Sequence, residues 1–254
     1  MELLNKQLIK DYLCNNHTID ESTGKLILEP VKYRWTHGAT DLHLGDGLLV
    51  YSLILFNRAK TCVCIGSGGG FIPRLMTQAR KDLWEQKIFE GNNSTEWGDI
   101  GTTIVIDAAN GVGGFTDWTE ENSFLRQHFA PQVIIETSER AYYDYFVRQD
   151  IKIDYLHIDG DHSYEGVKKD FELYSQIMSE NGIITIHDTD QSYHNTFLIP
   201  DTQKTDFAEF DGPAKFIEEL KNNPKYNLVN LKNFITFTHK TTSTGLTVVT
   251  KNKI

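Results

Sequence analysis

The sequence is poor in cysteine, in proline and in long apolar runs, and each shortage excludes a class of protein. Its 254 residues include three cysteines and six prolines. Cys14, Cys62 and Cys64 are too few and too unevenly spaced for a disulfide framework or a zinc site. No apolar run approaches the roughly 20 residues that span a bilayer, and the first residues lack the layout of a secretory signal. We therefore predict a protein of the reducing cytoplasm with no membrane partner.

Positive charge is also scarce. Lysine and arginine total 25 against 35 aspartates and glutamates, which gives a formal net charge of −10. Nucleic-acid binding depends on clustered cations that neutralise phosphates, so nucleic acid is not expected as a partner. The length suits one domain with a substantial core. A small molecule is the expected partner, and the sequence leaves a homo-oligomer open.

Residues 151–189 carry the pattern that organises the chain. Residues 151–158 and 183–186 are two apolar runs typical of buried strands, and each is bounded by turn-forming residues. The apolar residues between them follow the spacing of one helix face: Val167, Phe171, Tyr174 and Ile177. Strand, helix and strand form a right-handed crossover, which makes the two strands parallel. Both strands therefore end at the same edge of the sheet.

Ionisable side chains follow both of these strands. Asp159, Asp161 and His162 come after the first strand, and His187 and Asp188 come after the second. Ligands of open α/β sheets bind outside the carboxyl ends of the strands. We therefore expect most of these side chains to meet over one crevice, although Asp161 could equally cap the following helix.

A glycine turn follows an earlier strand. Residues 61–70, TCVCIGSGGG, read as a short strand and a turn, and a helix follows with Pro73 in its first turn. Glycines at 66, 68 and 70 permit a tight turn that presents backbone N–H groups and a helix N-terminus to a polar ligand. Placed between a strand and a helix, this turn indicates an adenosine-type cofactor.

The next strand, residues 102–106, ends at Asp107, an expected partner of the ribose hydroxyls. Asp107 lies 37 residues beyond Gly70, against about 20 in the usual fingerprint. We attribute the excess to a turn-rich insertion at residues 91–101. After a third strand at residues 132–135, Ser138 either caps the next helix, which is the preferred interpretation, or lies beside the adenine.

The other elements are expected from periodicity and turn signals. The long polar segment 190–212 is predicted to be a substrate loop or lid. A short helix is expected near the N-terminus, and residues 33–43 are read as irregular and able to cover the crevice. Further helices are expected at residues 48–56, 117–129 (capped by Thr116 or Asp117), 139–148 and 213–220, and an antiparallel pair of strands at 226–237 and 245–251.

Together these motifs resemble the class I S-adenosylmethionine-dependent methyltransferases. The resemblance is carried by CVCIGSGGG, IDGDHSYEG, Asp170, GIITIHDT and GLTVVTK. Its specific part, the IDGDHSYEG and HDT pair, is similar to the family that includes cephalosporin hydroxylase-like proteins and the sugar O-methyltransferases of macrolide and aminocoumarin biosynthesis. The fold it implies is an α/β, Rossmann-like, doubly wound sheet of seven strands with a C-terminal antiparallel hairpin. It covers residues 35–254, and residues 1–34 are expected to form a helical or irregular extension.

The resemblance also implies ligands and site residues. The cofactor would be S-adenosylmethionine, bound by Gly66, Ser67, Gly68, Gly70, Asp107, Ala108, Thr137, Ser138 and Asp159. A divalent metal, Mg²⁺ or Mn²⁺, would be held by Asp159 and Asp188, with His187 as a third ligand. Relatives often have a carboxylate in place of His187, which leaves a metal-free enzyme open.

The predicted function is O-methylation of a sugar, a sugar nucleotide or a related small hydroxylated metabolite. Asp159, His162 and His187 are the expected catalytic residues, because the acceptor hydroxyl must be positioned and must lose its proton. Three alternatives stay open: a nicotinamide-dependent oxidoreductase, a non-catalytic binding protein with the same fold, and a hydroxylase.

Overall fold

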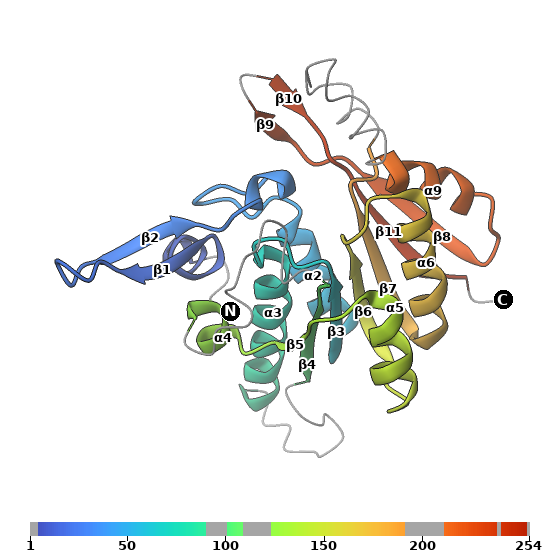
Figure 1. Cartoon of the computed structure of the whole chain (residues 1–254), viewed down its shortest axis with the longest axis horizontal. Coiled ribbons are helices and arrows are strands. Elements are labelled where there is room, and N and C mark those ends of the chain that lie inside the picture. The colour runs from blue at the N-terminus through green and yellow to red at the C-terminus, as the bar shows by residue number, and fades with distance from the viewer. Residues whose placement is uncertain (1–4, 90–100, 109–122, 191–210, 238–239, 253–254) are drawn as a thin grey trace.

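The computed structural model describes residues 5–89, 101–108, 123–190, 211–237 and 240–252. A seven-stranded sheet forms its centre (Figure 1). No helix within these ranges is long and apolar enough to cross a membrane.

The sheet has the strand order β5-β4-β3-β6-β7-β11-β8. The five strands from β5 to β7 are parallel, whereas β11 runs antiparallel to both β7 and β8. This arrangement confirms the predicted fold, including the antiparallel C-terminal pair. The strands are β3 (Thr61–Ile65), β4 (Thr102–Ile106), β5 (Gln132–Ile134), β6 (Ile153–Ile158), β7 (Met178–His187), β8 (Tyr226–Leu231) and β11 (Leu246–Lys251).

Helices cover both faces of the sheet (Figure 1). On one face, α2 (Gly47–Asn57) and α3 (Phe71–Phe89) pack over the side chains of Cys62, Cys64 and Tyr155. The other face is covered by α5 (Ser138–Ala141), which continues as a π-helical turn, and by α6 (Tyr164–Tyr174) and α9 (Gly212–Leu220). Strand residues alternate between these two apolar clusters, as the two-residue period of a strand requires. Burial on both faces explains why the parallel strands are nearly continuous apolar runs.

The N-terminal residues form a hairpin that the sequence did not predict. After α1 (Lys6–Leu8) and the π-helical turn Ile9–Leu13, strands β1 (Asn15–Ile19) and β2 (Leu26–Pro30) pair antiparallel and extend away from the body (Figure 1). Most of their side chains are exposed or half-buried, so no alternation of apolar and polar residues marks them. The chain then enters the 3₁₀ turn η2 (Arg34–His37), which leads toward the sheet.

The last part of the chain departs from the prediction at Asn233. The expected strand 226–237 is two strands, because β8 ends at Leu231 and β9 (Ile235–Phe237) pairs separately with β10 (Lys240–Thr242). The carbonyl of the Asn233 side chain accepts hydrogen bonds from the backbone N–H groups of Thr244 (2.9 Å) and Gly245 (3.2 Å). Hydrogen bonds to the Asn233 side chain thus replace the backbone pairing of the two strands at this point, and the predicted strand is interrupted.

Two other element boundaries differ from the prediction, and three predicted features lie wholly or mostly outside the described residues. β7 begins at Met178 instead of residue 183, and its pairing with β6 is irregular between Met178 and Ile183. α4 (Phe124–Phe129) begins after Ser123, whose hydroxyl accepts from the Arg126 N–H at 3.2 Å. The proposed cap at Thr116 or Asp117, most of the insertion 91–101 and most of the loop or lid 190–212 lie outside the described residues.

Candidate active site

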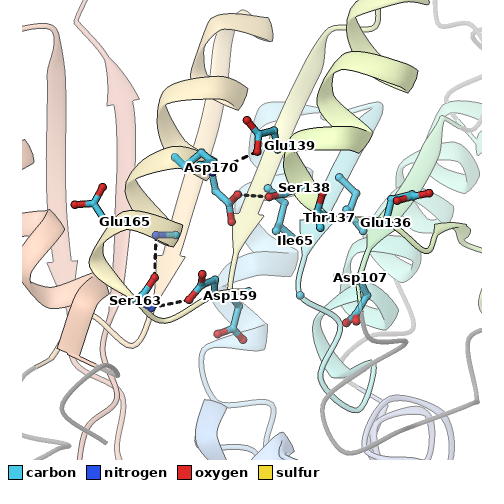
Figure 2. Close-up of a pocket in the computed structure, with 17 residues that line it drawn as sticks. Ile65, Asp107, Glu136, Thr137, Ser138, Glu139, Asp159, Ser163, Glu165 and Asp170 are labelled. Atoms are coloured by element: carbon cyan, nitrogen blue, oxygen red, sulfur yellow. Dashed lines mark hydrogen bonds and ion pairs between the residues drawn. The ribbon is translucent and has the colours of Figure 1, made fainter. Parts of the chain in front are cut away.

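A cavity of about 520 Å³ opens at the carboxyl ends of β3, β4, β5 and β6 (Figure 2). This size is within the usual range for small-molecule sites, about 300–1,000 Å³. Six of the predicted cofactor-binding residues line it: Gly66, Asp107, Ala108, Thr137, Ser138 and Asp159. Ser67, Gly68 and Gly70 belong to the same turn but are not among the lining residues.

Gly66 is the glycine that the turn requires. Its φ is +81°, and a Cβ added there would lie 2.0 Å from the backbone oxygen of Asp159. The Gly66 N–H donates to the Ile106 carbonyl, and the Asp159 N–H donates to the Ile65 carbonyl, both at 2.9 Å. The glycine turn is therefore held between its two neighbouring strands, and only a residue without a side chain fits there.

Asp107 reaches the glycine turn despite its unusual spacing in the sequence. Its Oδ2 accepts hydrogen bonds from the Ser67 N–H at 2.9 Å and from the Ser67 hydroxyl at 2.6 Å. The carboxylate also lines the cavity and is buried. Asp107 is thus held at the end of β4 beside the glycine turn, where the sequence predicted an acid that binds ribose.

The helix after β5 is capped by Thr137, so the predicted cap, Ser138, was wrong. The Thr137 hydroxyl accepts from the Arg140 N–H at 3.3 Å. The Ser138 hydroxyl instead donates to the buried carboxyl of Asp170, on α6 (Figure 2). Burial raises the pKa of Asp170 to about 6, although the Ser138 hydrogen bond opposes this. Both side chains line the cavity, so they contribute to the ligand site.

Several lining residues had no predicted ligand role. Asp170 stood among the residues of the resemblance, but nothing in its spacing assigned it a function. Glu136 follows the third strand and could have been found by the same strand-end reasoning that identified Asp107. The residues missed are Ile65, Ile106, Glu136, Glu139, Gly160, Ser163, Glu165, Gly166, Lys169 and Asp170.

The predicted catalytic and metal-binding side chains meet beside this cavity. His162 Nε2 lies 3.2 Å from Asp159 Oδ1 and 3.4 Å from Asp188 Oδ2. His187 Nδ1 lies 3.5 Å from Asp159 Oδ1 and 3.2 Å from Asp188 Oδ1. The two carboxylates therefore stand between two imidazoles. The parallel pairing of β6 and β7 creates this arrangement.

The ionisation of each side chain in this group depends on the charges of the others. Burial would raise the pKa of Asp159, but the charge of His187 and the hydrogen bond with His162 hold it well below its usual range. Burial would lower the pKa values of both histidines, yet the nearby carboxylates outweigh it. The pKa of His162 is raised, and that of His187 is raised well above its usual value. The group attracts positive charge, which protons or a metal cation can supply.

Asp188 has a left-handed backbone conformation, with a φ of +57°, which aspartate adopts more readily than most residues. Asp161 accepts a hydrogen bond from the Ser163 N–H at 2.8 Å, and Ser163 caps α6. Asp161 therefore supports the start of the helix, and it also lines the cavity.

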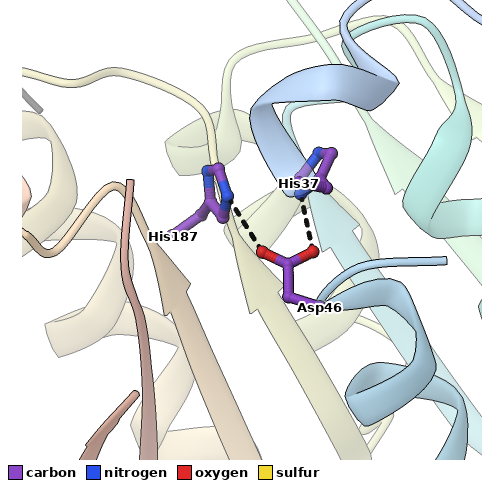
Figure 3. Close-up of side chains that lie close together, drawn as sticks. All are labelled: His37, Asp46 and His187. Atoms are coloured by element: carbon purple, nitrogen blue, oxygen red, sulfur yellow. Dashed lines mark ion pairs between the residues drawn. The ribbon is translucent and has the colours of Figure 1, made fainter. Parts of the chain in front are cut away.

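Two further residues of this region were not predicted. His37 ends the turn η2, and Asp46 precedes α2; both are buried and lie against His187 (Figure 3). The ring centroids of His37 and His187 are 4.3 Å apart. Residues 33–43 thus reach the crevice. His157, on β6, is also buried, and its Nδ1 lies 2.9 Å from the Thr185 hydroxyl.

The described residues fit the two groups that the resemblance implies. For the cofactor, the cavity has the glycine turn after β3 and the carboxylate of Asp107 at the end of β4. For a divalent metal, one donor atom from each of Asp159, His162 and Asp188 lies within 4.8 Å of the others. Asp188 Oδ1 is buried and accepts no hydrogen bond from the described residues. Carboxylate oxygens suit Mg²⁺ and Mn²⁺.

A family model described as a methyltransferase domain matches residues 63–189. This range extends from β3 and its glycine turn to the residues after β7. It therefore includes both the cavity and the group of carboxylates and histidines beside it. No curated protein sequence matches the chain.

Solved structures with a similar fold include several O-methyltransferases. One, from Bacillus cereus in complex with S-adenosylhomocysteine (SAH), shares 14% identity with a TM-score of 0.57, covering 82% of this chain and 80% of that one. TomG from Streptomyces achromogenes, involved in tomaymycin synthesis and in complex with S-adenosylmethionine, has 12% identity, a TM-score of 0.58 and 87% coverage of both chains. The SAH-bound methyltransferase PaMTH1 from Podospora anserina has 13% identity, a TM-score of 0.51 and coverage of 85% and 80%.

Proposed function

Because the chain belongs to the methyltransferase-domain family and is a class I S-adenosylmethionine-dependent methyltransferase, we propose that it methylates a hydroxyl oxygen of a small acceptor. The observation that carries this proposal is the meeting of Asp159 with His162, His187 and Asp188 at the rim of the cofactor cavity. The family assignment removes the nicotinamide oxidoreductase from the alternatives. The O-methyltransferases of similar fold are in keeping with an oxygen acceptor.

S-Adenosylmethionine supplies a methyl group on a sulfonium, and the acceptor oxygen has to be aligned with it and freed of its proton. Gly66 and Asp107 would hold the adenosine part in the cavity. Asp159 lines that cavity and also faces the two histidines, so it connects the cofactor pocket with the acceptor side. An acceptor hydroxyl placed near Asp159 would therefore lie next to groups that can take its proton.

We assign the divalent metal, Mg²⁺ or Mn²⁺, to Asp159 and Asp188. His162 and His187 both present a ring nitrogen within 3.5 Å of these carboxylates and are the candidates for a third ligand. A cation there would replace the positive charge that the raised pKa values of the histidines now favour. It would lower the pKa of a coordinated hydroxyl, and the histidine outside the coordination sphere would accept the proton.

The acceptor class that agrees best with this site is a sugar or sugar nucleotide. Adjacent hydroxyl groups can chelate a divalent ion, and the resemblance of the IDGDHSYEG and HDT motifs is to sugar O-methyltransferases. The acidic surroundings favour an acceptor whose reacting hydroxyls are uncharged and whose phosphate charges, in a sugar nucleotide, lie away from Asp159 and Asp188.

The test combines cofactor binding with an acceptor screen. SAH is titrated calorimetrically into the full-length protein, after chelation and again with added Mn²⁺. Sugars and sugar nucleotides are then incubated with S-adenosylmethionine, and each product is checked by mass spectrometry for the gain of one methyl group. We expect SAH to bind in both conditions and methyl transfer to require Mn²⁺. Absence of SAH binding would contradict the cofactor site, whereas transfer that is unaffected by chelation would contradict the metal assignment.

A further inference from the structure

A second group of possible ligands lies behind the strand-end carboxylates. His37, Asp46 and His187 are 6%, 8% and 2% exposed, and they converge from a 3₁₀ turn, a helix start and a strand end (Figure 3). We propose that these three side chains form a buried binding site for a first-row transition-metal ion of the Zn²⁺ type. This site shares His187 with the oxygen-rich one proposed above, through the other ring nitrogen, and does not depend on the acceptor.

The spacing of the donor atoms agrees with coordination to one ion. Asp46 Oδ1 lies 3.2 Å from His37 Nδ1, and Asp46 Oδ2 lies 3.3 Å from His187 Nε2. One donor atom from each of the three residues lies within 4.8 Å of the others. Metal–ligand bonds of 2.0–2.1 Å in a tetrahedral site separate neighbouring donors by roughly 3.3 Å.

Hydrogen bonding leaves two of these donor atoms unsatisfied. His37 Nδ1 and Asp46 Oδ1 are buried and make no hydrogen bond within the described ranges of the chain. Buried polar atoms almost always have a partner, and an unmet one is costly. An ion between His37 Nδ1 and Asp46 would satisfy both atoms at once.

The other ring nitrogens face groups that orient metal-binding histidines. With His187 Nε2 toward Asp46, its Nδ1 lies 3.2 Å from Asp188 Oδ1. His37 likewise has Nε2 3.9 Å from Asp159 Oδ2. Histidine ligands of metals usually donate their second N–H to a carboxylate, which fixes the ring and its tautomer. His187 thus has such a carboxylate within hydrogen-bond distance, whereas the carboxylate that faces His37 lies beyond it.

Asp46 is held in place by neighbouring polar groups. Asn233 Nδ2 donates to Asp46 Oδ2 at 3.0 Å, and the hydroxyl of Thr244 lies 3.3 Å from His187 Nε2. These contacts fix the carboxylate and the imidazole before any ion arrives. The Thr244 hydroxyl also lies close enough to share the His187 nitrogen with an ion.

The backbone brings His37 and Asp46 together in one closed turn. The Asp46 N–H donates to the His37 carbonyl at 2.9 Å. Gly45 makes this approach possible, because its φ is +54° and a Cβ there would lie 1.8 Å from the His37 oxygen. The two ligands are therefore preorganised by the turn, and β7 supplies the third.

Two imidazoles and one carboxylate favour Zn²⁺, Fe²⁺ or Co²⁺ over Mg²⁺. A bound ion would connect the turn at residues 37–46 to the end of β7. It would also direct the His187 Nδ1–H toward Asp188, and so set the hydrogen bonding of the catalytic side.

Cobalt provides a spectroscopic test with the full-length protein. After chelator treatment, Co²⁺ is titrated and the visible d–d absorption is recorded; we expect saturation at one strongly bound ion, and displacement by Zn²⁺. His37→Gln and Asp46→Asn should each weaken Co²⁺ binding at least tenfold. His162→Gln, which changes the strand-end group but none of the three proposed ligands, and His128→Gln, which removes an exposed imidazole on α4, should leave the band in place.

A measurement on the unsubstituted protein guards against variants that fail to fold. X-ray absorption of the Zn²⁺-loaded protein should show two imidazole ligands in the first coordination shell. The proposal is overturned if no d–d band develops, or if the band survives His37→Gln and disappears in His162→Gln. A Zn²⁺ shell that lacks imidazole would overturn it as well.

Discussion

The hydroxyl of Ser67 lies 2.6 Å from Oδ2 of Asp107 and donates a hydrogen bond to it. This contact joins the glycine turn after β3 to the end of β4, and the two residues are 40 positions apart in the sequence. The Ser67 N–H reaches the same oxygen at 2.9 Å. The acid expected to bind ribose is therefore positioned by the turn expected to approach the cofactor, and each depends on the other.

Replacing Asp107 with alanine should weaken SAH binding by about 10- to 100-fold, the equivalent of about 1.5–3 kcal/mol for hydrogen bonds to a charged group. Ser67→Ala should cost less, about tenfold or under, because the backbone N–H still holds the carboxylate. Calorimetric titration of SAH measures both. Unchanged affinity in Asp107→Ala would mean that another acid, with Glu136 the nearest candidate in the cavity lining, binds the ribose.

Gly66 and Gly68 form a matched pair within one turn. Both have positive φ, +81° and +48°, so alanine at either position adds strain of about 1–2 kcal/mol. Only at Gly66 would the new Cβ meet backbone, 2.0 Å from the Asp159 oxygen, whereas it has open space at Gly68. We expect Gly66→Ala to lower the free energy of unfolding by about 1–3 kcal/mol more than Gly68→Ala. Urea denaturation measures this difference, and equal losses would contradict the close approach of the two strand ends.

Asp159→Asn should leave the fold intact and abolish methyl transfer. The amide is almost the same size but carries no charge, so it can neither hold a divalent cation nor stabilise the protonated histidines beside it. The matched control is Asp144→Asn, at an exposed carboxylate in the π-helical turn after α5 that is not among the cavity-lining residues. Both variants should remain folded, which circular dichroism checks. Methyl transfer should persist only in Asp144→Asn, and normal turnover in Asp159→Asn would contradict the mechanism.

Local patterns predicted the crossover from β6 to β7, because apolar periodicity and turn residues there lie within about forty residues of sequence. Topology then brought Asp159, His162, His187 and Asp188 to one edge without further information. His37 and Asp46 could not be found in this way. Their contact with His187 spans more than 140 residues and depends on a turn at Gly45 that has no periodic signal.

The wrong prediction of the helix cap, by one residue, had a different origin. Thr137 and Ser138 are both good helix caps, and sequence alone does not decide between adjacent cap formers. Thr137 is the cap because the Ser138 hydroxyl donates its hydrogen bond to Asp170, which lies 32 residues further along the sequence. In the same way, the break at Asn233 arises from side-chain contacts with residues 244 and 245, which no local strand pattern reports.

The pH dependence of stability should reveal the buried carboxyl of Asp170. Burial raises its pKa from 3.8 to about 6, so the folded protein holds a proton there that the unfolded chain has lost. The stability that this proton provides is complete below pH 3.8 and declines as the pH rises through 6. Two pH units of difference correspond to about 3 kcal/mol at most.

Asp170→Asn removes this titration, because the amide stays neutral at every pH. We therefore expect the variant to gain stability relative to the unsubstituted protein between pH 4.5 and pH 8, by about 1–3 kcal/mol. Urea denaturation at both pH values measures the gain. Glu172→Gln, on the exposed side of the same helix, is the control and should show no such change. If Asp170→Asn gained nothing at pH 8, the carboxylate would have to be stabilised there by a cation or a ligand, and SAH binding at the two pH values would be the next quantity to compare.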